Sequence, residues 1–307
     1  MDALNNILVI FDEKHDTQTA MLRAIELSRL TQARIHIIAT VYSNLNVIDG
    51  ELHIDTEQIL REGLQSRLNK ELRDYIDTLD AAGIDISYES LWSPHPHLDI
   101  ASLCERETFD LLIKTANKHG RFEGIFHTPL DWHLLRECPC PVLLVSEDKW
   151  PEGSSILVAI NANSDDKAHS HLNTMLIKTA NYFGLLLNHT VYVVNACPPL
   201  PILIDLEYTA IDPGTYFNNM HKIARDNILD IIKSYDLDES NIKIIDGNPE
   251  EAIPRVAQEM KSRLIILGTV SRTGLKGFVM GNTAEHLLHN PSCDVLALKP
   301  EGFHYNP

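Results

Sequence analysis

The sequence predicts an α/β protein of two tandem domains, each a five-stranded parallel sheet flanked by helices. Three observations lead to this fold class: the length of the chain, an internal repeat, and short apolar runs that alternate with longer segments of helical period. A chain of 307 residues is long for one hydrophobic core and natural for two domains of about 150 residues. We therefore expect one domain over residues 1–148 and a second over residues 153–307, joined by the short segment DKWPEG.

The two halves repeat each other in sequence, with the same order of parts in each. The matching runs are NILVIFD with SILVAIN, TFDLLIKTANKHGRFEG with SRLIILGTVSRTGLKGF, and WHLLRECPCPVLLV with EHLLHNPSCDVLAL. A repeat of this length indicates one structural unit that is used twice.

Each element of the second half follows from its hydrophobic pattern. Short β-rich apolar runs predict strands at residues 156–160, 190–196, 242–245, 264–267 and 295–298. Segments of helical period between them predict helices at about residues 167–187, 213–234, 249–261 and 283–289. Short strands that alternate with helices are typical of a parallel sheet covered by helices. The repeat predicts the same order in the first half.

Composition argues against several classes of protein. The chain has 43 acidic and 26 basic residues and a formal net charge of −17, so it lacks the basic field that nucleic-acid binding requires. No apolar run approaches the roughly 20 residues that span a bilayer, and the acidic, polar start MDALNN does not resemble a secretory signal. Five cysteines, odd in number and sparse, suit a reducing compartment. We expect a cytoplasmic protein with no nucleic-acid or membrane partner.

The stretch GTVSRTGLKGFVMGNTAEH, residues 268–286, is the most informative loop. It follows an apolar run and holds four glycines with two basic residues among them. Glycines let backbone N–H groups approach a phosphate, and a following helix N-terminus favours negative charge, although a tight loop without a ligand has the same composition. In open parallel sheets, ligands bind at the carboxyl ends of the strands where the strand order reverses. Asn161 and Gly268 end the first and fourth strands of this half, so we expect them to face one crevice.

From Gly268 the loop follows the pattern Gly, two residues, Ser271, nine residues, Gly281 and then two polar residues. With this loop, the doubled unit and the segments DWHLL and CPCPV, the chain resembles the universal stress protein family, and its E group in particular. The resemblance implies Rossmann-like sheets of strand order 3-2-1-4-5 and a site for ATP or a related adenine nucleotide, which Mg²⁺ could accompany. Carried over by position, the residues are Asn161 for the base and, for the phosphates, Gly268, Ser271, Arg272, Gly281, Asn282 and Thr283.

Two positions depart from the family's pattern, and a third also has a structural interpretation. Ser271 stands where the motif has its second glycine, and Asn161 stands where nucleotide-binding members usually have Asp. An amide donates and accepts hydrogen bonds, so contact with a base survives this change. Asn282 followed by Thr, Ala and Glu285 also matches a helix N-cap, which would expose the same N–H groups to a phosphate.

The first half keeps Asp12 but has lost the glycine loop. Lys114 and Asn117 are matched with the first two motif positions, and His127-Thr128-Pro129 lies where the last glycine should be. We expect this half to have a structural role and the nucleotide to bind in the second half. The resemblance also implies that the apolar edge strands at 142–145 and 295–298 pair the two halves as an intramolecular pseudo-dimer, with a further homodimer left open.

Metal sites are not the favoured interpretation of the histidines and cysteines. Cys138-Pro-Cys140 lacks the spacing of common zinc or redox motifs, so packing is the simpler role. His95-Pro-His97 occupies the place of the repeat segment DGNPEE, so we expect it to open the third helix of its half rather than hold a metal.

The leading functional hypothesis is a stress-response protein that binds a nucleotide as a regulatory ligand and is not an enzyme. Hydrolysis needs a positioned base and a metal-binding carboxylate, and near the loop the sequence offers Glu285 and His286. A slow ATPase is one alternative. The other is a binding or scaffold protein with an apolar ligand under the loop at residues 197–214.

Overall fold

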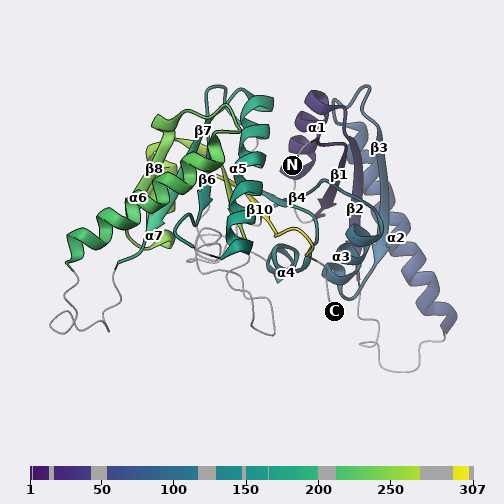
Figure 1. Cartoon of the computed structure of the whole chain (residues 1–307). Helices are drawn as coiled ribbons and strands as arrows, with labels where there is room; N and C mark the ends of the chain where they lie inside the picture. The colour runs from purple at the N-terminus through teal and green to yellow at the C-terminus, as the bar shows by residue number, and fades with distance from the viewer. Residues whose placement is uncertain are drawn as a thin grey trace. The chain divides into compact units, whose positions relative to one another are not determined.

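The computed structural model describes residues 1, 3–13, 17–42, 54–116, 129–146, 150–164, 166–199, 212–269 and 293–303. The chain folds into two compact units. One unit is built mainly from Ala3–Ala116 with Thr128–Asp148, and the other mainly from Lys149–Phe303. Each unit is a parallel sheet with helices packed on it (Figure 1).

The first unit has a sheet of strand order β3-β2-β1-β4-β5, and neighbouring strands are parallel. Its strands are β1 (Asn6–Phe11), β2 (Arg34–Val41), β3 (Ile86–Trp92), β4 (Leu111–Thr115) and β5 (Val142–Val145). Its helices are α1 (Thr19–Thr31), α2 (Ile54–Asp77), α3 (Pro96–Arg106) and α4 (Pro129–Glu137).

The second unit repeats this order as β10-β9-β6-β7-β8, again with parallel neighbours. Its strands are β6 (Ser155–Ile160), β7 (Thr190–Cys197), β8 (Ile242–Asp246), β9 (Ser262–Gly268) and β10 (Asp294–Leu298). Its helices are α5 (Lys167–Leu187), α6 (Pro213–Ile232) and α7 (Pro249–Glu259), with a 3₁₀ turn at Glu239–Asn241.

The predicted fold class is confirmed, and so is the strand order 3-2-1-4-5 that the family resemblance implied. The main differences lie at helix ends. The helix predicted to reach residue 261 ends at Glu259, because Lys261 adopts a left-handed backbone with φ of 53° and β9 starts at the next residue. The helix predicted at residues 283–289 lies outside the described residues.

The core of each unit consists of strands that are apolar on both faces, as parallel sheets between helices require. All residues of β6 and β10 are buried, and α5 packs fully buried residues such as Ile177 and Phe183 onto its sheet. Within the described residues, no helix combines the length and the apolar character that a membrane crossing requires.

Candidate functional site

The carboxyl edge of the second sheet brings together the ends of β6, β7 and β9. β6 pairs in parallel with β9 on one side and with β7 on the other, so the strand order reverses beside β6. Such a reversal is where open parallel sheets bind ligands. The structure places both Asn161 and Gly268 at this edge, directly after β6 and at the end of β9.

Asn161 has a fixed backbone and an exposed side chain. Its N–H donates to Oδ1 of Asn173 at 3.2 Å, and its carbonyl accepts from Nδ2 of the same side chain at 2.8 Å. Asn173 lies on α5 and is buried. The Asn161 side chain is exposed and has no hydrogen bond within the described part of the chain. Its amide can therefore serve a ligand without breaking a contact of the fold.

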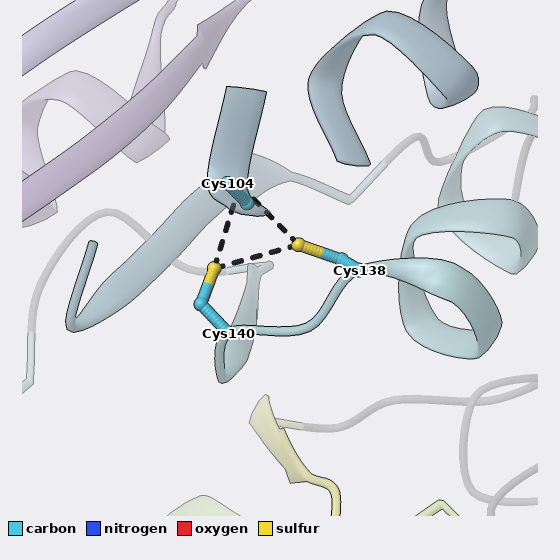
Figure 2. Close-up of side chains that lie close together, drawn as sticks. All are labelled: Cys104, Cys138 and Cys140. Atoms are coloured by element: carbon cyan, nitrogen blue, oxygen red, sulfur yellow. Dashed lines mark hydrogen bonds between the residues drawn. The ribbon is translucent and has the colours of Figure 1, made fainter. Parts of the chain in front are cut away.

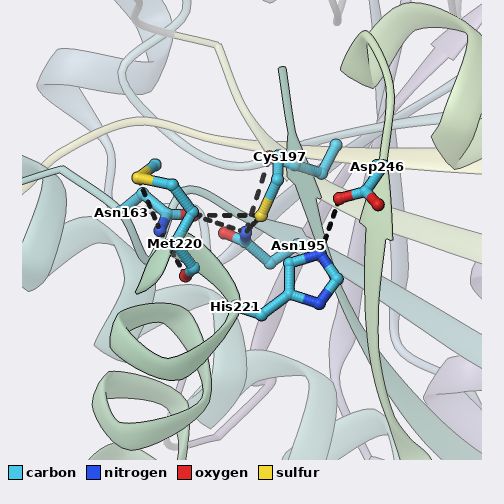
Figure 3. A network of polar contacts seen from close by, with 7 residues as sticks. Asn163, Asn195, Cys197, Met220, His221 and Asp246 are labelled. Atoms are coloured by element: carbon cyan, nitrogen blue, oxygen red, sulfur yellow. Dashed lines mark hydrogen bonds and ion pairs between the residues drawn. The ribbon is translucent and has the colours of Figure 1, made fainter. Parts of the chain in front are cut away.

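Three asparagines beside Asn161 hold the loop after β6 by hydrogen bonds and are here called the amide cluster: the half-buried Asn163, the buried Asn195 and the exposed Asn227 (Figure 3 shows the first two). Asn195, at the end of β7, accepts from the N–H of Ala162 at 2.7 Å and donates to Oδ1 of Asn163 at 2.7 Å. Asn227 of α6 donates to the carbonyl of Ala162 at 2.8 Å, and Asn163 donates to the carbonyl of Met220 at 2.8 Å. The cluster holds the loop after β6 in place with neutral groups only.

The outer rim of this edge carries a thiol, an imidazole and a carboxylate (Figure 3). Nε2 of His221 on α6 lies 2.6 Å from Oδ1 of Asp246 at the end of β8, and the ligand atoms of Cys197, His221 and Asp246 all lie within 4.8 Å of one another. These are ligand types that zinc accepts. However, burial and then the charge of Asp246 raise the pKa of the Cys197 thiol, so the metal-binding thiolate is disfavoured.

Gly268 has a packing role that the sequence did not reveal. A Cβ at this position would lie 2.6 Å from Cδ2 and 3.3 Å from Cγ of Leu172 on α5, which is buried. Gly268 is not among the described glycines with positive φ. The glycine therefore lets α5 pack closely on β9, whether or not its N–H group also faces a phosphate.

The other predicted phosphate residues, Ser271, Arg272, Gly281, Asn282 and Thr283, lie outside the described residues. The same holds for Glu285, His286 and most of the loop at 197–214. Their roles stay predictions.

The register of the two sheets corrects one alignment made from the sequence. Thr115, not Lys114, is the counterpart of Gly268, and Lys114 is the counterpart of the buried Leu267. The pairs that establish this equivalence are Leu8 with Leu112 in β1 and β4, and Leu157 with Ile265 in β6 and β9. The sequence alignment matched these strands one residue out of step.

Lys114 forms a buried ion pair with Asp131 at the corresponding place in the first unit. Its Nζ lies 2.8 Å from Oδ1 of Asp131, and the two side chains are 1% and 0% exposed. The same Nζ donates to the carbonyl of Thr115 at 3.0 Å, and the Thr115 hydroxyl accepts from the N–H of Ala20 at 3.1 Å. The cation that sequence analysis placed in the glycine loop is thus part of the core, neutralised by a carboxylate of α4.

The first unit keeps the backbone clamp that was described for Asn161. Gln18 accepts from the N–H of Asp12 at 3.2 Å and donates to its carbonyl at 2.6 Å. Asp12 and Asn161 therefore occupy equivalent positions at the ends of β1 and β6. The clamp residues and the amide cluster were missed from the sequence, because isolated polar residues in loops and helices carry no spacing signal.

His97 lies at the start of α3, where Pro96 takes the first helical position as expected. Its ring stacks on His133 with centroids 3.9 Å apart, and Nδ1 of His133 lies 2.9 Å from Oε1 of Glu137. Burial and the charge of His133 lower the pKa of His97. Burial alone would raise the pKa of Glu137, but hydrogen bonds from His133 and Arg136 lower it below its ordinary value. The trio His97, His133 and Glu137 has ligand atoms within 4.8 Å of one another.

Comparison with known proteins gives one consistent result. The universal stress protein family matches residues 4–146 and 155–299. Universal stress protein E of Salmonella typhi is 33% identical over 307 residues, covering 99% of this chain and 96% of that protein. Universal stress protein E of Escherichia coli K12 is 32% identical, with the same coverage.

Solved structures agree with this result. A functionally unknown protein from Pseudomonas aeruginosa PAO1 has a TM-score of 0.71 and 27% sequence identity, covering 98% of this chain and 94% of that chain. A universal stress protein from Archaeoglobus fulgidus has a TM-score of 0.64 at 14% identity, covering 96% of this chain and 98% of that one, a similarity of fold.

Proposed function

This chain belongs to the universal stress protein family of stress-response proteins, and we propose that its second half binds ATP or a related adenine nucleotide as a regulatory ligand. The observation that carries the proposal is Asn161. It lies at the strand-order reversal, its backbone is held by Asn173, and its amide is exposed and has no hydrogen bond within the described residues. An amide that donates and accepts matches the hydrogen-bonding edge of an adenine or a ribose.

The rest of the ligand would extend toward the loop after β9. We assign Gly268, Ser271, Arg272, Gly281, Asn282 and Thr283 to the phosphates on the strength of the motif. Gly268 ends β9, the neighbour of β6, so a nucleotide with its base at Asn161 would direct its phosphates toward the end of β9. Backbone N–H groups and a helix N-terminus would supply the favourable charge.

A regulatory role fits the described edge better than hydrolysis does. The amide cluster beside Asn161 consists of side-chain amides that already bond to one another or to the main chain of Ala162, and amides are poor general bases. Asp246, which could bind a metal, is paired with His221 at 2.6 Å. Mg²⁺ would then be held mainly by the phosphates, as is common for this ion. We further propose that the protein works in the cytoplasm and that its net charge of −17 keeps it off nucleic acids.

The test is a matched pair of variants, Asn161→Ala and Asp12→Ala. Both change a side chain at the end of a first strand, and both keep the main-chain N–H and carbonyl groups to which Asn173 and Gln18 bond. Asn161→Ala should weaken ATP by roughly 3- to 10-fold, the effect of one lost hydrogen bond, while Asp12→Ala should not change binding. Equal effects of the two substitutions would contradict the assignment.

Two alternatives are decided by the same protein preparation. Native mass spectrometry of the purified chain would identify a copurified nucleotide or, instead, an apolar molecule. A time course of ADP release from bound ATP should stay flat for a regulatory ligand. Steady turnover that Asn161→Ala slows would assign the protein as a slow ATPase.

A further inference from the structure

The first unit contains three thiols that lie close together, those of Cys104, Cys138 and Cys140 (Figure 2). The Sγ atoms of Cys138 and Cys140 are 3.4 Å apart, and each lies 3.6 Å from Sγ of Cys104. The three residues are 7%, 0% and 7% exposed for Cys104, Cys138 and Cys140 respectively. The three sulfurs form a nearly equilateral, buried triangle, here called the thiol triangle.

The fold fixes the thiol triangle from three sides. Cys104 is in the last turn of α3, and Cys138 follows α4 directly, with its N–H donating to the carbonyl of Leu134 at 3.0 Å. The carbonyl of Pro141, next to Cys140, accepts from the N–H of Leu112 at 2.9 Å. A triangle held by two packed helices and a strand is preorganised for a ligand that uses all three sulfurs at once.

The surroundings oppose negative charge on these sulfurs. Hydrogen bonds to Cys104 and Cys138, together with burial, raise the pKa of the Cys140 thiol well above its ordinary value. The ends of α3 and α4 that meet the thiol triangle are C-terminal ends, which carry partial negative charge. A ligand that left a net anionic complex in this interior would be strongly disfavoured.

The spacing of the sulfurs also selects among ions. A tetrahedral zinc site with Zn–S bonds of about 2.3 Å holds its sulfurs about 3.8 Å apart and takes four protein ligands. The thiol triangle is tighter than that. A trivalent ion with a lone pair binds three sulfurs in a pyramid, with angles at the ion close to a right angle, and it therefore tolerates shorter sulfur–sulfur distances. Three thiolates around a trivalent centre also make a neutral complex.

We propose that Cys104, Cys138 and Cys140 bind a trivalent thiophilic metalloid of the arsenite class as a neutral three-sulfur complex. The exchange is As(OH)₃ with three thiols: three As–S bonds form, three As–O bonds and three S–H bonds break, and three water molecules leave. Arsenic stays trivalent, so no electron acceptor or donor is needed. Soft sulfur ligands favour such soft centres. The site is separate from the nucleotide site proposed above, which lies in the other unit.

The experiment uses the full chain, reduced with a phosphine because a dithiol would compete for the probe. Arsenite is added, unbound arsenic is removed, and arsenic per chain is measured by elemental mass spectrometry. We expect one arsenic per chain, lost in Cys104→Ser, Cys138→Ser and Cys140→Ser, and retained in the control Cys293→Ser, which changes another buried cysteine outside the triangle. A folded single variant of the triangle that keeps full binding would overturn the proposal.

Two measurements on the unaltered protein do not depend on how the variants fold. X-ray absorption at the arsenic edge should show three sulfur neighbours and no oxygen, and any arsenic–oxygen contact would overturn the proposal. Binding should be almost equal at about pH 6 and pH 8, because the exchange releases water and no proton, whereas binding of a divalent metal by thiols releases protons. A steep rise of arsenite affinity with pH would also overturn it.

Discussion

Removal of the Asp131 carboxylate should destabilise the first unit far more than removal of both members of its ion pair. The two charged groups are 2.8 Å apart and almost completely buried, with exposures of 1% for Lys114 and 0% for Asp131. Asp131→Ala leaves the Lys114 ammonium buried in the core. Within the described residues, its remaining hydrogen bond is the one to the carbonyl of Thr115. Breaking a buried pair in this way costs about 3–5 kcal/mol of unfolding free energy.

The repeat itself supplies the double variant. The strand register matches Lys114 with Leu267, and the sequence repeat matches Asp131 with Ala284, so both matched residues of the second half are apolar. Lys114→Leu with Asp131→Ala therefore copies the apolar residues that the repeat carries at these positions in sequence. Replacing a buried ion pair by apolar residues is often neutral or stabilising by about 1–4 kcal/mol, so the double variant should be at least as stable as the unaltered chain.

Urea unfolding followed by tryptophan fluorescence can isolate the first unit. The chain has three tryptophans, Trp92, Trp132 and Trp150, and only Trp150 belongs to the second unit. In a Trp150→Phe background the signal reports the first unit, and a double-mutant cycle gives the coupling free energy. A double variant as unstable as Asp131→Ala, or a single variant with less than about 1 kcal/mol of destabilisation, would refute this reasoning.

Three further predictions follow from other parts of the structure. Gly268→Ala should lower the free energy of unfolding by about 1–3 kcal/mol, because its Cβ would meet the buried Leu172. Together with Leu172→Ala it should cost less than the sum of the two single substitutions, and additive costs would place the strain elsewhere. Folding lowers the pKa of His97, so the unfolded chain binds a proton at His97 more readily than the folded chain does. The contribution of His97 to the free energy of unfolding is therefore fully present above about pH 6.5 and is lost as the pH falls. His97→Asn should flatten the fall of the urea midpoint between about pH 7 and pH 5, and parallel curves for the two proteins would show that His97 is not the cause. Residues 153–307 expressed alone should dimerise or aggregate through the apolar strand at 295–298, measured by light scattering, whereas a soluble monomer at high concentration would exclude the proposed pairing of edge strands.

The order of elements could be predicted because the apolar runs and the repeat agree. Runs such as Ser155–Ile160 are buried along their whole length, and such runs are recognisable without any alignment. Their uniformity also explains the one error of register. Buried parallel strands lack the alternation of apolar and polar residues that marks a one-residue slip, so Lys114 was matched with Gly268 instead of Leu267.

The functional clusters depend on contacts between distant segments. Cys104 is 34 residues from Cys138, and Asn173 is 12 residues from the Asn161 backbone that it clamps. Single polar or thiol side chains on helices have no spacing rule that would connect them to a partner on another element. The short Cys138-Pro-Cys140 motif could be seen in the sequence. Nothing in the sequence connected it with Cys104, whose sulfur completes the thiol triangle.

The most direct test of the central claim is a count of nucleotide sites. Calorimetric titration of the full chain with ATP should give one site per chain, absent in Gly281→Val and retained in Thr128→Val, its counterpart in the first half. A valine Cβ at the last motif glycine would keep the phosphates from the backbone, whereas the first half has already lost that glycine. Two sites per chain, no binding to the unaltered protein, or equal loss in both variants would contradict the account.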